Sequence, residues 1–185
     1  RDPKFELQKD KRFYASVSGH KLTFSSELRD SLAETLALLG NRYESLSNCS
    51  PGKPQRAAIL AVREIFENAD WQLWGSLNRL LPNLAEAAPH EFLRVVESSL
   101  ADPACPFDEL FRQEGDGISG DNHLTGLLWA LEALAWSEEF LAKVPNAGQW
   151  LHPWFSRYDV PDVHGLKGLA LLSSCSFISF LERTI

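Results

Sequence analysis

Residues 114–123 hold the densest group of potential metal ligands in the chain. Three carboxylates and one imidazole lie close together there, at Glu114, Asp116, Asp121 and His123. Carboxylate oxygens are the ligands that Mg²⁺ and Ca²⁺ prefer, so one interpretation of the chain is a small metal-dependent hydrolase. The spacing does not match an EF-hand loop, however, and acidic loops are commonly only solvated. We therefore favour a solvated loop and predict no metal or other cofactor.

The same loop contains a glycine pattern that is found in phosphate-binding proteins. Gly115, Gly117 and Gly120 fit GxGxxG and precede a predicted helix. In dinucleotide-binding folds this pattern follows a strand, whereas here the preceding segment has helical periodicity. The neighbouring carboxylates would also repel a pyrophosphate. We predict that the loop joins two helices and binds no nucleotide.

Histidine and cysteine residues elsewhere form no recognisable catalytic pattern. The chain has no HExxH, GxSxG or CxxC motif, which are the local signatures of zinc peptidases, serine hydrolases and metal or redox sites. Its three cysteines are widely spaced, which suits a reducing cytosol better than a disulfide framework. We therefore predict a cytoplasmic protein that is not an enzyme.

Composition narrows the classes of partner. The 185 residues carry a formal net charge of −7, and 44% of them are hydrophobic. An acidic protein is poorly suited to nucleic acid, which requires basic patches that displace counterions. The longest apolar run, 166–181, is interrupted by Lys167 and is shorter than the ~20 residues that a membrane-spanning helix needs. We predict that the chain binds neither nucleic acid nor membrane.

Helical periodicity runs through residues 25–144. Ser25 or Ser26 is suited to cap a helix. Leucines recur after these serines at three- and four-residue steps and form one stripe, at Leu28, Leu32, Leu36 and Leu39. Gly40 is placed to end that helix, and Pro54 and Asp70 suit the starts of two others. No segment shows sustained alternation of apolar and polar residues. We predict an all-α fold of stacked helical hairpins.

Residues 121–144 read as one such hairpin, and we expect the fold to be organised around it. Asp121 and Ser137 are suited to cap the two helices. Leucines recur between them at helical steps, and Trp129 and Trp136 widen the apolar stripe. We expect both indoles to be buried, because little of the first helix can then face water.

The flanking segments differ in character. Residues 1–24 are charged and lack a period, 145–162 form a connector rich in tryptophan and proline, and 163–185 predict an apolar helix packed on the array. A spacing near 48 also relates Tyr43, Phe92 and Phe140, just above the ~40–47 residues of HEAT-like repeats. Leucine-rich helices yield such matches by chance as well, so both interpretations stay open.

A repeat of this length would place three charged residues at equivalent exposed positions, each beside an aromatic anchor. These are Arg42, Glu91 and Glu139, and repeat arrays present such positions along one continuous binding face. We predict that a protein partner binds there. Trp150 and Trp154 in the connector form a second candidate surface, since tryptophan is enriched at interface hot spots.

Four segments carry a resemblance to a known family: LAETLALLG (32–40), LLPNLAEAAPHEFLRVVESSL (80–100), residues 105–120 and HLTGLLWALEALAWSEEFLAKV (123–144). They resemble the helical region of large multidomain bacterial proteins that carry a STAND-type P-loop NTPase. The resemblance implies a helical part that lies beyond the NTPase, in proteins commonly linked to defence against phage. Such a region would bind a target protein or restrain the NTPase, and any oligomer would form through the parent protein.

The resemblance weakens after Val144. The family pattern continues with a longer helix before a Gly-Asn-Trp element, whereas Gly148, Gln149 and Trp150 follow almost at once here. No Walker A loop occurs in these residues, so the resemblance implies that this part is not the catalytic one. A stand-alone helical scaffold for protein interactions is the alternative interpretation.

Overall fold

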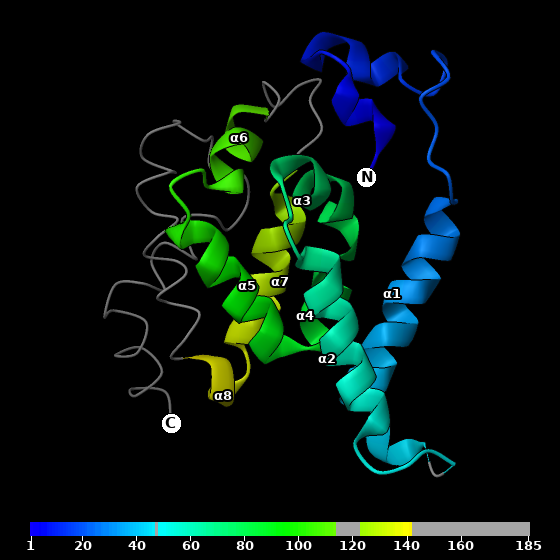
Figure 1. Cartoon of the computed structure of the whole chain (residues 1–185), viewed down its shortest axis with the longest axis vertical. Coiled ribbons are helices and arrows are strands. Elements are labelled where there is room, and N and C mark those ends of the chain that lie inside the picture. The colour runs from blue at the N-terminus through cyan, green and yellow to red at the C-terminus, as the bar shows by residue number, and fades with distance from the viewer. Residues whose placement is uncertain (47, 114–122, 142–185) are drawn as a thin grey trace.

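The structure, a computed structural model of the chain, describes residues 1–46, 48–113 and 123–141 (Figure 1). The described part is all-α, as the sequence predicts, and contains no strand. Its α-helices are α1 (Ser26–Asn41), α2 (Lys53–Phe66), α3 (Trp71–Leu77), α4 (Leu81–Ala87), α5 (Pro89–Ala101), α6 (Pro106–Gln113), α7 (Thr125–Ala135) and α8 (Glu138–Leu141). Short 3-10 segments accompany them: η1 (Pro3–Glu6), η2 (Lys9–Tyr14), η3 (Tyr43–Ser45) and η4 (Asn78–Leu80). The predicted connector 145–162 and the predicted helix 163–185 lie outside the described residues.

Side-chain caps begin two of the helices. Oγ of Ser25 accepts the backbone N–H of Leu28 at 3.3 Å at the start of α1, and Oδ1 of Asp70 accepts that of Leu73 at 2.9 Å at the start of α3. First-turn N–H groups have no partner inside a helix, so these side chains supply the missing acceptors. Both predicted caps are confirmed.

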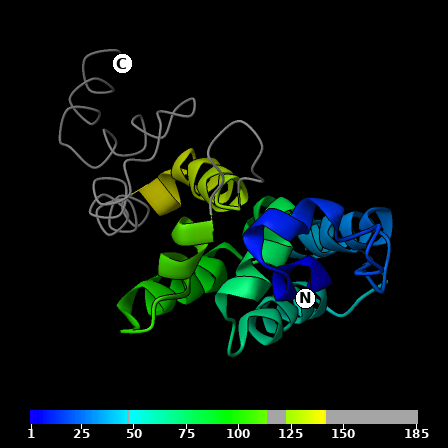
Figure 2. The ribbon, with the colours of Figure 1, turned by 90° about the horizontal axis from the view of Figure 1, so that it is seen from above.

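Helix α4 lies at the centre of the fold. It packs against α1, α2, α5 and α7. In Figure 1, α1 and α5 lie on opposite sides with α2 between them, and Figure 2 shows α7 on the side of the molecule away from α2. A helix with neighbours on most sides must be apolar around most of its surface, and α4 buries Leu81, Leu84, Ala85 and Ala87. The organising element is therefore α4 and not the hairpin at 121–144.

The crossing of α1 over α4 depends on a glycine. A β-carbon at Gly40 would overlap the carbonyl oxygen of Ala87, so the two backbones are in direct contact. The prediction that Gly40 ends the helix is wrong, because α1 continues to Asn41. Gly40 lies inside α1, where its missing side chain lets the backbone of α4 come close, and it does not form a left-handed turn.

This close approach also decides which face of α1 is buried. The helix turns Ala33, Ala37 and Gly40 toward the core, because only small side chains fit where α4 lies so near. Leu28 and Leu32 are 47% and 61% exposed. The predicted leucine stripe is therefore wrong at Leu28 and Leu32, whereas Leu36 does pack, partly buried, against the core.

An aromatic cluster around Trp74 joins α2, α3, α5 and α6. The indole is fully buried, and its ring centroid lies 4.4 Å from that of Phe66, 6.3 Å from Phe92 and 4.9 Å from Phe107. Tilted and edge-to-face pairs at such distances add to the free energy of area burial. This cluster holds together the half of the fold that contains the candidate site.

Trp129 of α7 and Trp136, the residue that caps the C-terminal end of this helix, lie outside this core. Leu127, Leu131 and Leu134 of α7 are buried, and α7 packs on α4, whereas Trp129 is 62% and Trp136 78% exposed. The prediction that both indoles are buried is wrong. Helix α7 has apolar residues on two sides, and the fold turns the leucine side inward.

Candidate functional site

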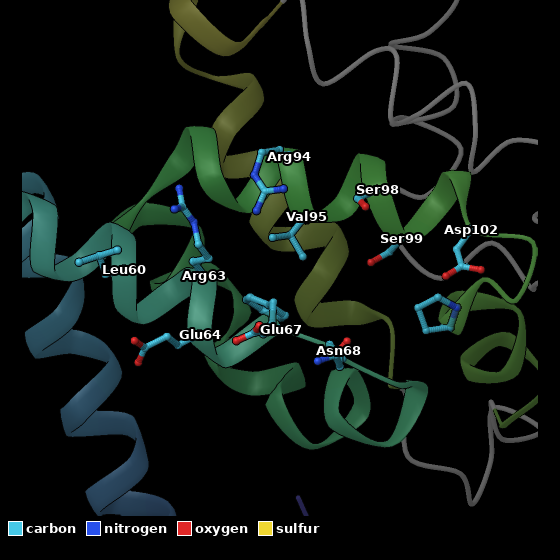
Figure 3. Close-up of a pocket in the computed structure, with 13 residues that line it drawn as sticks. Leu60, Arg63, Glu64, Glu67, Asn68, Arg94, Val95, Ser98, Ser99 and Asp102 are labelled. Atoms are coloured by element: carbon cyan, nitrogen blue, oxygen red, sulfur yellow. The ribbon is translucent and has the colours of Figure 1, made fainter.

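A groove of about 450 Å³ runs between α2 and α5 (Figure 3). Its floor is partly apolar, with Phe66, Val95 and Pro106, and the side chains around it are mostly polar. Those that bear on binding are Arg63, Glu64, Glu67 and Asn68 from α2 and the turn after it, and Arg94, Ser98, Ser99 and Asp102 from α5 and its C-terminal cap.

Glu91 holds two arginines at one end of this groove. Nε of Arg63 donates to Oε1 of Glu91 at 2.9 Å, and Nε of Arg94 donates to Oε2 at 3.1 Å. The carboxylate side chain is 8% exposed, while the two arginine side chains are 55% and 58% exposed. Glu91 therefore lies beneath the arginines and fixes α2 to α5.

The arginines retain donors for a ligand. Each uses Nε and Nη2 toward Glu91, which leaves Nη1 of each guanidinium without a protein acceptor in the part of the chain that the structure describes. A guanidinium offers five N–H donors in a rigid fork. Two such forks held by one carboxylate form a pre-organised set of hydrogen-bond donors for an oxyanion.

Charge is distributed unevenly along the groove. The pKa of Glu91 is lowered to about 2, because Arg94 and then Arg63 donate hydrogen bonds to its carboxylate. At Glu91 itself one negative charge meets two positive charges, so this ion-pair cluster is net positive. Glu64, Glu67 and Asp102 make the remainder of the lining acidic.

The groove is thus suited to a ligand that carries charges of both signs. Arg94 and Asp102 are eight positions apart along α5, and a helix rises ~1.5 Å per residue, so the two charges lie on the order of 12 Å apart. A peptide segment with an acidic and a basic side chain can span that distance. Among the described residues that line the groove there is no histidine or cysteine.

Of the predicted partner-binding residues that the structure describes, two are exposed and one is buried. Arg42 follows the end of α1 and is exposed, whereas Glu91 lies near the start of α5 and is buried. Glu139, in α8, is exposed, and its Oε1 lies 2.8 Å from Nε2 of His90. The prediction that Glu91 is an exposed equivalent of Arg42 is wrong, because its carboxylate is enclosed by two arginines. Trp150 and Trp154 lie outside the described residues.

Of the residues considered as metal ligands, only His123 is described. Its ring is buried and lies edge-on to Phe5, with 5.0 Å between the ring centroids. Glu114, Asp116 and Asp121, like the glycine loop 115–120, lie outside the described residues. Among the residues that the structure does describe, no three histidine, cysteine or carboxylate side chains come together as a possible metal site.

Comparison of the chain with protein-family models, with curated proteins and with solved structures finds no match. Within the described ranges, no helix has both the length and the hydropathy required to cross a bilayer.

Proposed function

We propose that this chain is a non-catalytic recognition or regulatory region of a larger bacterial protein, and that its groove between α2 and α5 receives a peptide segment of a protein partner. The observation that carries the proposal is the pair of arginines, Arg63 and Arg94, held by the buried Glu91 at one end of an otherwise acidic groove. Arginines fixed in this way lose little side-chain entropy when they bind a carboxylate.

Charge complementarity defines the partner segment. An acidic side chain would bind between Arg63 and Arg94, and a basic side chain would lie near Asp102 at the other end (Figure 3). Such an arrangement sets the direction and register of the bound segment and rejects segments of a single charge sign. The apolar floor at Val95 adds contact area between the two charged ends.

The sequence resemblance supports a parent with a STAND-type NTPase. In that setting the described helices belong to a HEAT-like array in the cytoplasm, and occupation of the groove releases or restrains the NTPase during defence against phage. A stand-alone helical scaffold is the second candidate. The reading frame of the gene distinguishes them: a GxxxxGK[ST] loop upstream of this region supports the NTPase parent, and a complete gene without that loop supports the scaffold.

A blocked groove tests the binding role. Ser98 is exposed on α5, and Ser98→Arg would fill the groove without removing a core contact. Ser31→Arg places the same side chain on the exposed surface of α1 and is the matched control. We expect the parent and Ser31→Arg to capture a partner from the native cytosol, and Ser98→Arg to capture none. The purified partner should likewise bind the parent and Ser31→Arg with similar affinity and Ser98→Arg much more weakly. Equal binding by all three proteins would place recognition elsewhere.

A further inference from the structure

The outward face of α1 is apolar and largely open to solvent. Phe24, just before the N-cap of the helix, is 62% exposed, and Leu28, Leu32 and Leu38 are 47%, 61% and 60% exposed. The three leucines lie on the half of the helix opposite Ala33, Ala37 and Gly40, which face the core. Figure 1 shows α1 at one edge of the molecule, where its outward face meets no other described helix.

The middle of this face can be covered without leaving a polar group unpaired. Thr35 lies there between Leu32 and Leu38, and its hydroxyl donates a hydrogen bond of 2.7 Å to the carbonyl oxygen of Ser31. A buried hydroxyl is costly only when it lacks such an acceptor. Exposed large hydrophobic residues that gather on one face mark an interaction surface, and nothing polar at the centre of this one opposes burial.

We infer that two copies of this chain associate through α1, with the two helices antiparallel about a two-fold axis near Thr35. The charges at the ends of the face support this arrangement. Glu27 lies in the first turn and Arg42 is the C-terminal cap, and both are exposed. They are at nearly equal distances on either side of Thr35, so an antiparallel pair brings Glu27 of each copy beside Arg42 of the other.

The same charges exclude a parallel pair. Parallel helices would bring Glu27 against Glu27 and Arg42 against Arg42, and like charges that face each other destabilise an interface. A two-fold interface uses the same patch on both copies, so that patch must be complementary to itself. The outward face of α1 meets this condition in the antiparallel direction, in which Leu32 of each copy also lies opposite Leu38 of the other.

The size of the face indicates a weak and reversible dimer. Phe24, Leu28, Leu32 and Leu38 expose roughly 100 Å² apiece, or about 400 Å² on each copy. A standard interface buries ~800 Å² on each partner, and smaller ones are typical of transient complexes. We therefore expect a dissociation constant on the order of 10–100 µM.

Sedimentation equilibrium of the full chain over a range of concentrations tests the inference. The apparent mass should rise from that of one 20.8 kDa chain toward that of two. Leu32→Glu should raise the dissociation constant at least ~10-fold, because it buries a charge opposite Leu38. Leu60→Glu, at a leucine of α2 that is 46% exposed, is the matched control and should dimerise as the parent does. A single-chain mass at every concentration would overturn the inference, and so would a dimer that Leu32→Glu leaves intact.

Exchange of charges tests the antiparallel direction. Arg42→Glu alone should weaken the dimer about tenfold, because each copy then brings two carboxylates together. The double variant Glu27→Arg/Arg42→Glu should restore the affinity of the parent. Far-UV circular dichroism of each variant verifies that α1 is still folded. A folded double variant that remains as weak as Arg42→Glu would overturn the antiparallel pairing.

The dimer does not rest on the groove between α2 and α5, and the two proposals can fail separately. Ser31→Arg leaves the groove open but adds a charge beside Thr35 on the outward face of α1. We expect this variant to sediment as a single chain and still to capture the groove's partner. Ser98→Arg should do the reverse. A dimer that Ser31→Arg leaves unchanged would count against the α1 interface, whatever the result of the capture experiment.

Discussion

The backbone N–H of Gly126 donates a hydrogen bond of 2.8 Å to Oδ1 of Asn78. This N–H belongs to the first turn of α7, whose own N-cap residue, Leu124, forms no side-chain cap. Asn78 therefore supplies the missing acceptor from a different part of the chain. A β-carbon at Gly126 would overlap the carbonyl oxygen of Asn78, so the start of α7 lies in backbone contact with η4.

Replacement of Gly126 by alanine should displace the start of α7. The added carbon meets backbone and not a flexible side chain, so the helix must shift, and we expect a loss of about 3 kcal/mol in the free energy of unfolding. Urea denaturation followed by far-UV circular dichroism measures the loss. Ala133→Ser, on the exposed face of the same helix, should change the midpoint little, and an unchanged midpoint for Gly126→Ala would contradict the close contact.

The two classes of tryptophan should respond differently to truncation. Trp74→Ala removes the centre of the aromatic cluster and should cost about 3–5 kcal/mol of stability. Trp129→Ala removes a side chain that is 62% exposed and should change unfolding of the core by less than about 1 kcal/mol. Thermal melts of the two variants beside the parent provide the comparison. A larger loss for Trp129→Ala would show that the core extends over the outer face of α7.

Thiol alkylation should distinguish the two described cysteines. Cys49 is exposed and Cys105 buried, and burial raises the pKa of the Cys105 thiol, so less of it is the reactive thiolate at neutral pH. We expect iodoacetamide to label Cys49 in the native protein and Cys105 only after unfolding. Peptide mass mapping gives both extents, with Cys49→Ser as the control. Comparable labelling of Cys105 under native conditions would mean that α6 opens readily.

The positions of the helices could be predicted from the sequence because periodicity and capping are local. Ser25 and Asp70 cap the helices that their positions in the sequence predict, and Pro54 lies in the first turn of α2. The buried face could not be predicted where a helix has apolar residues on more than one side. In α1 the buried face is decided by the contact of Gly40 with Ala87. The two residues are far apart in the sequence, so no local pattern reveals this contact.

The ion pairs of the groove also depend on long-range packing that the local sequence does not show. The spacing of Glu91 and Arg94 indicates an ion pair on one helix, because residues three apart lie side by side. Arg63 comes from a different helix, and its convergence on Glu91 depends on how α2 packs against α5. An exposed position for Glu91 was therefore the natural expectation from sequence, and its burial follows from a partner that the local pattern does not show.

The ion pairs of Glu91 should make stability depend on pH in acid. In the folded protein the pKa of Glu91 is about 2, below the ordinary value of 4.5, because the carboxylate accepts hydrogen bonds from Arg94 and Arg63. A lowered pKa means that protonation favours the unfolded chain. The stabilisation is therefore complete above about pH 4.5, declines as the pH falls, and is lost as the pH passes through about 2.

The Glu91→Gln variant isolates this contribution because it keeps the shape of the side chain and removes its charge. At pH 7 we expect the variant to be less stable than the parent by on the order of 2 kcal/mol, since both arginines are partly screened by solvent. The difference should narrow as the pH falls and approach zero only below about pH 2, where the parent carboxylate also becomes neutral. Denaturation curves at several pH values measure it, with Glu139→Gln as a control at an exposed pair. A difference that stays constant with pH would show that Glu91 stabilises the fold through packing and not through its charge.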